Sequence, residues 1–204
     1  MRKGEKRKQQ KARKRTHAQW LMPPLQLLQA RSYPLEGCWV QEDWRESGLA
    51  VVVVARRQPN GRIVFGNYLV DYYCLGLKST YCNFDIPPER FYRELLPQMI
   101  SFAGRPQSIS AGLAHELIYG AIEYAAQFGF RPDRDYRLSQ YVLDPPEMHP
   151  RTGKVEFGKE GKPFFISGPH DDAKAVVSQL LRTAGEGNFD YLVVIDPDEL
   201  VLDE

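Results

Sequence analysis

Cysteine is scarce in this sequence, and the few thiols present do not form a metal-binding pattern. The 204 residues include three cysteines, Cys38, Cys74 and Cys82, with no CxxC pair among them. Three widely spaced cysteines leave one thiol over in any disulfide scheme and argue against a zinc knuckle. We therefore expect free structural thiols and a reducing compartment, which favours the cytoplasm.

Long apolar runs are also lacking. The longest, Leu49–Ala55, has the length of a β-strand and is too short to cross a bilayer. The apolar stretch that follows the basic start is interrupted by Pro23 and Pro24, so it does not fit a secretory signal. The sequence therefore predicts a protein without a membrane span.

Motifs that name a reaction are missing as well. There is no GxSxG and no P-loop, and no histidine has a spaced serine or cysteine partner. The pair His115-Glu116 is not part of an HExxH motif, because position 119 is tyrosine. The dense aromatic residues between Tyr68 and Tyr92 include no RNP-like pattern. Function must therefore be argued from charge and from scattered polar residues.

Acidic residues are almost absent from the first 16 positions. This segment holds nine of the 27 Lys and Arg residues and one of the 26 acids, Glu5, for a net charge of +8. The rest of the chain keeps 18 bases and 25 acids, a net charge of −7. Because like charges repel and nothing apolar is available to bury, residues 1–16 predict a disordered basic arm. Residues 17–204 predict one acidic globular domain.

The basic arm is the strongest indication of a partner. Lysine and arginine neutralise phosphates and release counterions, which gives salt-sensitive affinity for RNA or DNA independent of sequence. The residues expected to bind nucleic acid are Arg2, Lys3, Lys6, Arg7, Lys8, Lys11, Arg13, Lys14 and Arg15. A solubilising tail, an acidic protein or membrane surface as partner, and folding of the arm onto the acidic domain are the alternatives.

The middle of the chain predicts an antiparallel meander of about three strands. The β-branched run Leu49–Gln58 and the run Arg62–Leu77 flank Asn60-Gly61, which predicts a hairpin with a type I′ turn. The stretch Tyr72–Phe84 predicts the third strand, and a short strand is expected at Cys38–Gln41. The expected core face comprises Val52, Val54, Val64, Leu69 and Leu75.

Two helices are expected to cover one face of this meander. A short helix is predicted over about Pro88–Leu96, and a long one over Ser110–Phe130, with Ser108 or Ser110 as its cap. The long helix repeats apolar residues every three or four positions, so it needs cover on more than one side. Its glycines, Gly112 and Gly120, suggest close backbone packing against the sheet.

The C-terminal part predicts a β-hairpin followed by a β–α–β unit. Lys154–Gly158 is expected to pair with Lys162–Ser167, and a helix is expected over about Asp171–Ala184. A strand at about Tyr191–Ile195 would then lie parallel to the one before the helix. The fold class predicted from these elements is α+β.

Scattered carboxylates support an alternative, enzymatic hypothesis. Glu116, Asp71, Asp171 and Asp172 could together hold Mg²⁺ or Mn²⁺, as metal-dependent nucleases and hydrolases require. His170, beside Asp171, is the histidine to test. In the structural interpretation, Asp171 or Asp172 caps the helix that follows it. Glu116 then lies on the solvated side of the long helix.

The leading hypothesis from sequence is a non-enzymatic protein that contacts RNA or the ribosome through its arm and needs no cofactor. A metal-dependent nuclease or hydrolase around Glu116 is one alternative, and a protein–protein adaptor is the other.

Overall fold

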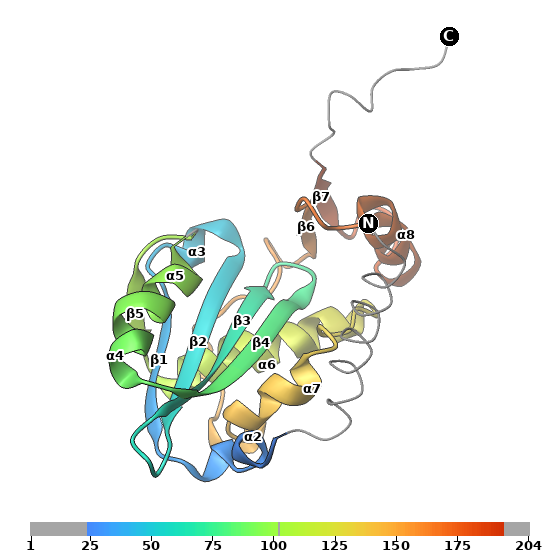
Figure 1. Ribbon diagram of the computed structural model, residues 1–204. Helices are drawn as coiled ribbons and strands as arrows, with labels where there is room; N and C mark the ends of the chain where they lie inside the picture. The colour runs from blue at the N-terminus through green and yellow to red at the C-terminus, as the bar shows by residue number, and fades with distance from the viewer. Residues whose placement is uncertain (1–23, 102, 194–204) are drawn as a thin grey trace, which may run out of the picture.

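The computed structural model describes residues 24–101 and 103–193, and these are built around an antiparallel five-stranded sheet (Figure 1). The strands run in the order β4-β3-β2-β1-β5. Their bounds are β1 Leu35–Gln41, β2 Leu49–Arg57, β3 Ile63–Asp71, β4 Gly76–Ile86 and β5 Pro106–Ile109. The α+β class is confirmed. The basic arm, with its nine lysines and arginines, lies outside the described residues.

The sheet is larger than the expected meander. The strands β2, β3 and β4 form the predicted three-stranded part, and β1 adds to it through pairs such as Cys38↔Val54. The strand β5 pairs with the other edge of β1, as in Cys38↔Ile109. The strand expected at Cys38–Gln41 is therefore real, but it begins at Leu35 and holds an unexpected fifth strand.

The β2–β3 hairpin forms, but its turn is not type I′. Residues 58–62 connect the strands, because pairing ends at Arg57↔Ile63. A type I′ turn requires positive φ at two consecutive residues, and here Gly61 (φ 79°) follows Asn60, whose φ is not positive. The Gly61 N–H donates to the Gln58 carbonyl at 2.9 Å, and the Gln58 N–H donates to the Arg62 carbonyl at 2.8 Å. The loop is a longer turn that needs only one glycine.

Both faces of the sheet are buried, which corrects the expectation that helices cover one face. Val52 and Val54 contribute to the core beneath α6 (Ala111–Gln127), whereas Val51 and Val53 contribute to a second core on the opposite face. That second core is covered by the π-helical segment η2 (Phe91–Leu95) and by α5 (Leu96–Ile100), which follow the short helix α4 (Pro88–Arg90). Double-sided burial explains why β2 reads as an unbroken apolar run.

The predicted core face was therefore right for three residues and wrong for two. Val52, Val54 and Val64 belong to the core beneath α6. Leu69 packs against the opposite core, since side chains alternate between faces along a strand. Leu75 lies beyond the end of β3 and packs against a third cluster, formed with the C-terminal unit.

The long helix α6 has two close contacts at glycines. The expected packing of sheet backbone against Gly112 or Gly120 is not one of them. A Cβ at Gly120 would lie 2.1 Å from the Phe157 ring, so a loop side chain covers this position. The tight backbone contact lies at Gly76 (φ 72°), where a Cβ would be 2.9 Å from the Ala121 carbonyl oxygen. The sheet and α6 therefore approach each other closely because the glycine is on the strand.

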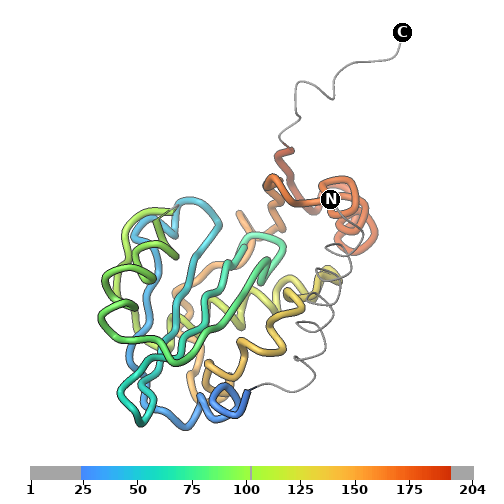
Figure 2. The backbone as a smooth tube through the Cα atoms, in the orientation of Figure 1, coloured from blue at the N-terminus to red at the C-terminus, as the bar shows by residue number. Residues whose placement is uncertain are grey.

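The short elements complete the first core. They are α2 (Leu25–Leu28), η1 (Ala30–Ser32), α3 (Trp44–Ser47), α7 (Tyr136–Ser139), η3 (Gln140–Val142) and η4 (Pro146–Met148). Val142 and Leu143 are fully buried beneath the sheet, so the segment after α6 returns along the same face. Figure 2 shows this return as the yellow and orange trace beside the strands.

The C-terminal β–α–β unit is confirmed, whereas the hairpin expected before it is not. Strands β6 (Phe164–Ile166) and β7 (Asp190–Leu192) are parallel, with α8 (Ala173–Thr183) between them. Residues 155–158 form no strand, and only an isolated bridge joins Lys159 to Lys162. The unit packs against the end of the main sheet through Cys74, Phe165 and Leu180 (Figure 1). The last predicted strand positions, 194 and 195, lie outside the described residues.

Within residues 24–101 and 103–193, no helix has the length and apolarity needed to cross a membrane.

Candidate functional site

Asp144 is the centre of a polar network that joins the sheet to the segment after α6. One of its carboxylate oxygens pairs with the Arg56 guanidinium, whose side chain is 4% exposed. Arg56 also donates to the Val142 carbonyl at 2.6 Å and to the Tyr33 carbonyl at 2.9 Å. Burial acts to raise the pKa of Asp144, but His149 and Arg56 outweigh burial and hold the pKa below its ordinary value.

Two histidines complete this network. The Nε2 of His149 lies 2.8 Å from the second oxygen of Asp144. The Nδ1 of His115 lies 2.7 Å from the Ala111 carbonyl, while its Nε2 accepts the Asp144 backbone N–H at 3.0 Å. Burial lowers the pKa of His115 to about 4, so the ring is neutral at pH 7. In this tautomer Nδ1–H donates and Nε2 accepts.

Among the described residues, His115, Asp144 and His149 are the group whose spacing could suit a metal ion, with ligand atoms within 4.8 Å of one another. These atoms are already engaged: both nitrogens of His115 and both oxygens of Asp144 have protein partners. The Arg56 guanidinium also supplies a positive charge where a cation would bind. We conclude that these residues fit a structural clamp better than a metal centre.

Glu116 is not on a solvated side of its helix. It is 3% exposed, and its carboxylate accepts the backbone N–H groups of Thr152 at 2.8 Å and Gly153 at 2.9 Å. The Thr152 hydroxyl donates to the same carboxylate. Burial acts to raise the pKa of Glu116, but these hydrogen bonds hold it below its ordinary value. Glu116 therefore anchors the loop that crosses over α6.

Asp71 and Asp171 are brought to the same lysine. Asp71 accepts the N–H groups of Tyr73 at 3.1 Å and Cys74 at 2.9 Å, and its burial raises the pKa to about 6. Lys78 opposes that rise, and its ammonium pairs directly with Asp171. Glu116 is not part of this pair of carboxylates, because its partners are in the loop at 152–153.

The other two sequence candidates have simpler places. Asp172 caps α8, and its side chain accepts the Ala175 N–H at 2.9 Å. His170 is exposed in the turn before that helix. Among the described residues, none of the five sequence candidates belongs to a cluster with the spacing of metal ligands.

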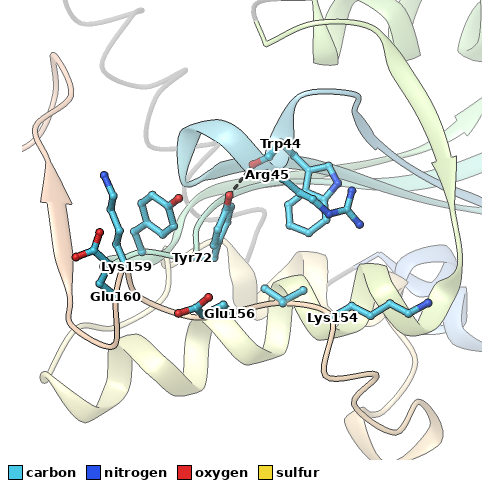
Figure 3. A pocket seen from close by; sticks show the side chains of 10 residues that line it. Trp44, Arg45, Tyr72, Lys154, Glu156, Lys159 and Glu160 are labelled. Atoms are coloured by element: carbon cyan, nitrogen blue, oxygen red, sulfur yellow. Dashed lines mark hydrogen bonds between the residues drawn. The ribbon is translucent and has the colours of Figure 1, made fainter.

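A groove of about 400 Å³ lies between α3, the β3–β4 turn and the loop at 154–160 (Figure 3). It combines aromatic and charged side chains from three parts of the chain. These are Trp44 and Arg45 of α3, Tyr72 and Tyr73 of the turn, and the loop at 154–160. The sequence did not reveal this site, because its parts lie more than 25 residues apart and come together only through the fold.

Comparison with known protein families, characterised proteins and solved structures finds no match for this chain. Its function must therefore be argued from its own residues.

Proposed function

We propose that this protein associates with nucleic acid, RNA in particular, and that the basic residues 1–16 supply most of the affinity. The observation that carries the proposal is the segregation of charge, +8 in these 16 residues against −7 in the rest of the chain. Nine cations within so short a segment can neutralise several phosphates at once. A cytoplasmic location is part of the same proposal.

The association with single-stranded nucleic acid draws support from the groove. Single-stranded nucleic acid is recognised by aromatic side chains that stack on bases and by cations that meet the backbone. In the groove, Tyr73 is a partly exposed ring and Arg45, Lys154 and Lys159 are exposed cations, while Trp44 and Tyr72 line the wall and are buried.

We propose a non-enzymatic role because the candidate carboxylates already have protein partners. Glu116 holds a loop, Asp172 caps a helix and Asp171 pairs with Lys78. A catalytic carboxylate in a two-metal site must instead keep oxygens available for the ions. Each candidate would have to give up a structural role to bind metal.

The test is fluorescence anisotropy with a labelled single-stranded RNA at increasing salt. If the arm contacts about five phosphates, raising the salt from about 0.1 to 0.3 M should weaken binding roughly 50-fold. Deleting residues 1–16, or replacing the nine bases by glutamine in the full chain, should remove this salt-dependent binding. Unchanged affinity in both variants would reject the proposal.

A cleavage assay with the same RNA tests the enzymatic alternative. Mg²⁺ or Mn²⁺ is added and RNA cleavage is followed by gel for the wild type and for Glu116→Gln. Metal-dependent cleavage that Glu116→Gln abolishes, while the matched Thr152→Val variant retains it, would replace our proposal with a nuclease. We expect intact RNA in all three samples.

A further inference from the structure

In the wall of the groove, the side chain of Arg45 lies over the aromatic ring of Trp44. The Arg45 guanidinium lies over the Trp44 ring, 4.3 Å from its centroid, and Tyr72 packs against the ring edge-on at 5.7 Å. Trp44 is 2% exposed, whereas Arg45 is exposed to solvent. Trp44 belongs to the core beneath α6, and Arg45 lies over the face of its ring on the groove side (Figure 3).

The indole also carries an unused hydrogen-bond donor. Its Nε1–H is buried and has no acceptor among the described residues. The neighbouring Tyr72 hydroxyl donates to the Trp44 carbonyl at 2.6 Å and accepts the Gly48 N–H at 3.2 Å, and it forms no hydrogen bond with the indole. A buried donor without an acceptor is unfavourable, so a ligand that supplied an acceptor here would gain affinity from it.

The charges around the groove favour an anion. Arg45, Lys154 and Lys159 line it, and none of them forms an ion pair with an acid among the described residues. Two glutamates, Glu156 and Glu160, line the same groove. The glutamates could accept hydrogen bonds from hydroxyl or amino groups of a ligand that also carries negative charge.

We propose that this groove binds one nucleotide unit of a single-stranded nucleic acid. The base stacks on the indole of Trp44 once Arg45 has moved aside, and the indole N–H donates to an oxygen of the same unit. Arg45 and Lys154, the two cations at the Trp44 end of the groove, then meet the phosphate (Figure 3). This proposal rests on the proposed association with RNA, and it adds a binding site on the globular domain that is separate from the arm.

The experiment titrates the full-length protein with adenosine 5′-monophosphate and follows tryptophan fluorescence. We expect saturable quenching that Trp44→Phe removes and that Arg45→Ala weakens roughly 10-fold, in line with the loss of about 1–2 kcal/mol of stacking and charge. Adenosine and inorganic phosphate, each used alone, should bind more weakly than the nucleotide. The control is Lys174→Ala, an exposed cation on α8 that does not line the groove, and it should bind like the wild type.

If Trp44→Phe fails to fold, the exposed positions still decide the matter. Arg45→Ala and Lys154→Ala change side chains that are exposed, and wild-type affinity for the nucleotide in both would overturn the proposal. Saturable binding of inorganic phosphate as tight as that of the nucleotide would overturn it too, because the base would then contribute nothing.

The two proposals can fail separately. The full-length variant with a neutralised arm should keep its affinity for the mononucleotide and lose its salt-dependent affinity for RNA. Loss of nucleotide binding in the wild type, with arm-dependent RNA binding intact, would reject the groove alone. Nucleotide binding in the groove together with RNA affinity that ignores the arm would reject the role of the arm alone.

Discussion

The Asp144 network and the Trp44 groove contain similar kinds of residues in opposite conditions. In the network, His115 and Arg56 are buried, Asp144 is partly buried, and the donors and acceptors of these three side chains have protein partners. In the groove, the cations are exposed and the indole N–H is buried without an acceptor. Polar groups that already satisfy one another stabilise the fold, whereas groups left unsatisfied can bind something else. The residue types that look most catalytic are thus the least free to act.

The largest expected effect comes from removing Arg56. Arg56→Ala would leave the Asp144 carboxylate without its guanidinium and would remove a donor from one buried and one partly buried carbonyl, so the unfolding free energy should fall by about 3–5 kcal/mol. Urea unfolding followed by circular dichroism measures this. The neighbouring Arg57→Ala is the control, because its pair with Glu36 is partly exposed and should contribute about 0–1 kcal/mol. Equal losses in the two variants would contradict a structural role for the network.

The next effect concerns pH and His115. The pKa of this histidine is about 4 in the fold and 6.5 when unfolded, so the unfolded chain binds more protons between these values. Stability from this residue is therefore present above pH 6.5 and is lost as pH falls towards 4, by about 3 kcal/mol. The groups facing His115 are Asp144, Arg56 and His149. We expect the stability difference between wild type and His115→Gln to grow from pH 4 to pH 7 in urea titrations.

Asp71 should act in the opposite direction over the same range. Its pKa is raised from 3.8 to about 6, so the folded chain holds its proton more tightly. The corresponding stability is present below pH 3.8 and is lost as pH rises through 6. Asp71→Asn keeps an acceptor for the turn but removes the titration, so it should gain on the wild type as pH rises from 4 to 7. A constant difference would contradict the raised pKa.

A smaller effect is expected at Glu116. Glu116→Gln turns an acceptor of three hydrogen bonds into a group whose amide faces some of those donors, which should cost about 1–3 kcal/mol. Thr152→Val removes one of the three bonds and should cost about 1 kcal/mol. Thermal unfolding compares the two. If Glu116→Gln is neutral, the loop at 152–153 does not depend on the carboxylate.

The smallest effect is expected in the groove. Arg45→Ala removes a cation–π contact at an exposed site and should change the unfolding free energy by less than about 1 kcal/mol. A loss as large as that of Arg56→Ala would mean that the groove is as fully used by the fold as the network is. Differential scanning calorimetry of both variants in one buffer gives the comparison directly.

The sequence predicted those elements whose signals are local. The β2–β3 hairpin follows from two β-branched runs around a glycine turn, and α6 follows from its apolar repeat and Ser110, whose side chain accepts the Leu113 N–H. The C-terminal parallel pair follows from the order of its elements. Elements that depend on distant partners were missed. The strand β5 is four residues long and begins with proline, so only its pairing with β1 makes it a strand.

The site could be predicted less well than the fold. The carboxylates of Glu116 and Asp71 stand out in sequence, yet backbone N–H groups far along the chain or in the next turn determine what they do. Sequence reasoning also missed Asp144. Its partners, Arg56 on β2 and His115 on α6, are far from it in the sequence. Burial decides whether a polar residue is structural or reactive, and burial is a property of the assembled core.

The position of Cys74 makes its thiol a reporter of how often the C-terminal unit opens. Its thiol is buried between the β3–β4 turn and the C-terminal unit, and burial together with the charge of Asp71 raises its pKa far above the ordinary value. Alkylation requires an accessible thiolate, so the reaction must wait until β6, α8 and β7 lift away. The alkylation rate of Cys74 therefore measures how fast the C-terminal unit opens. This rate can be compared with the rate at which the main sheet unfolds.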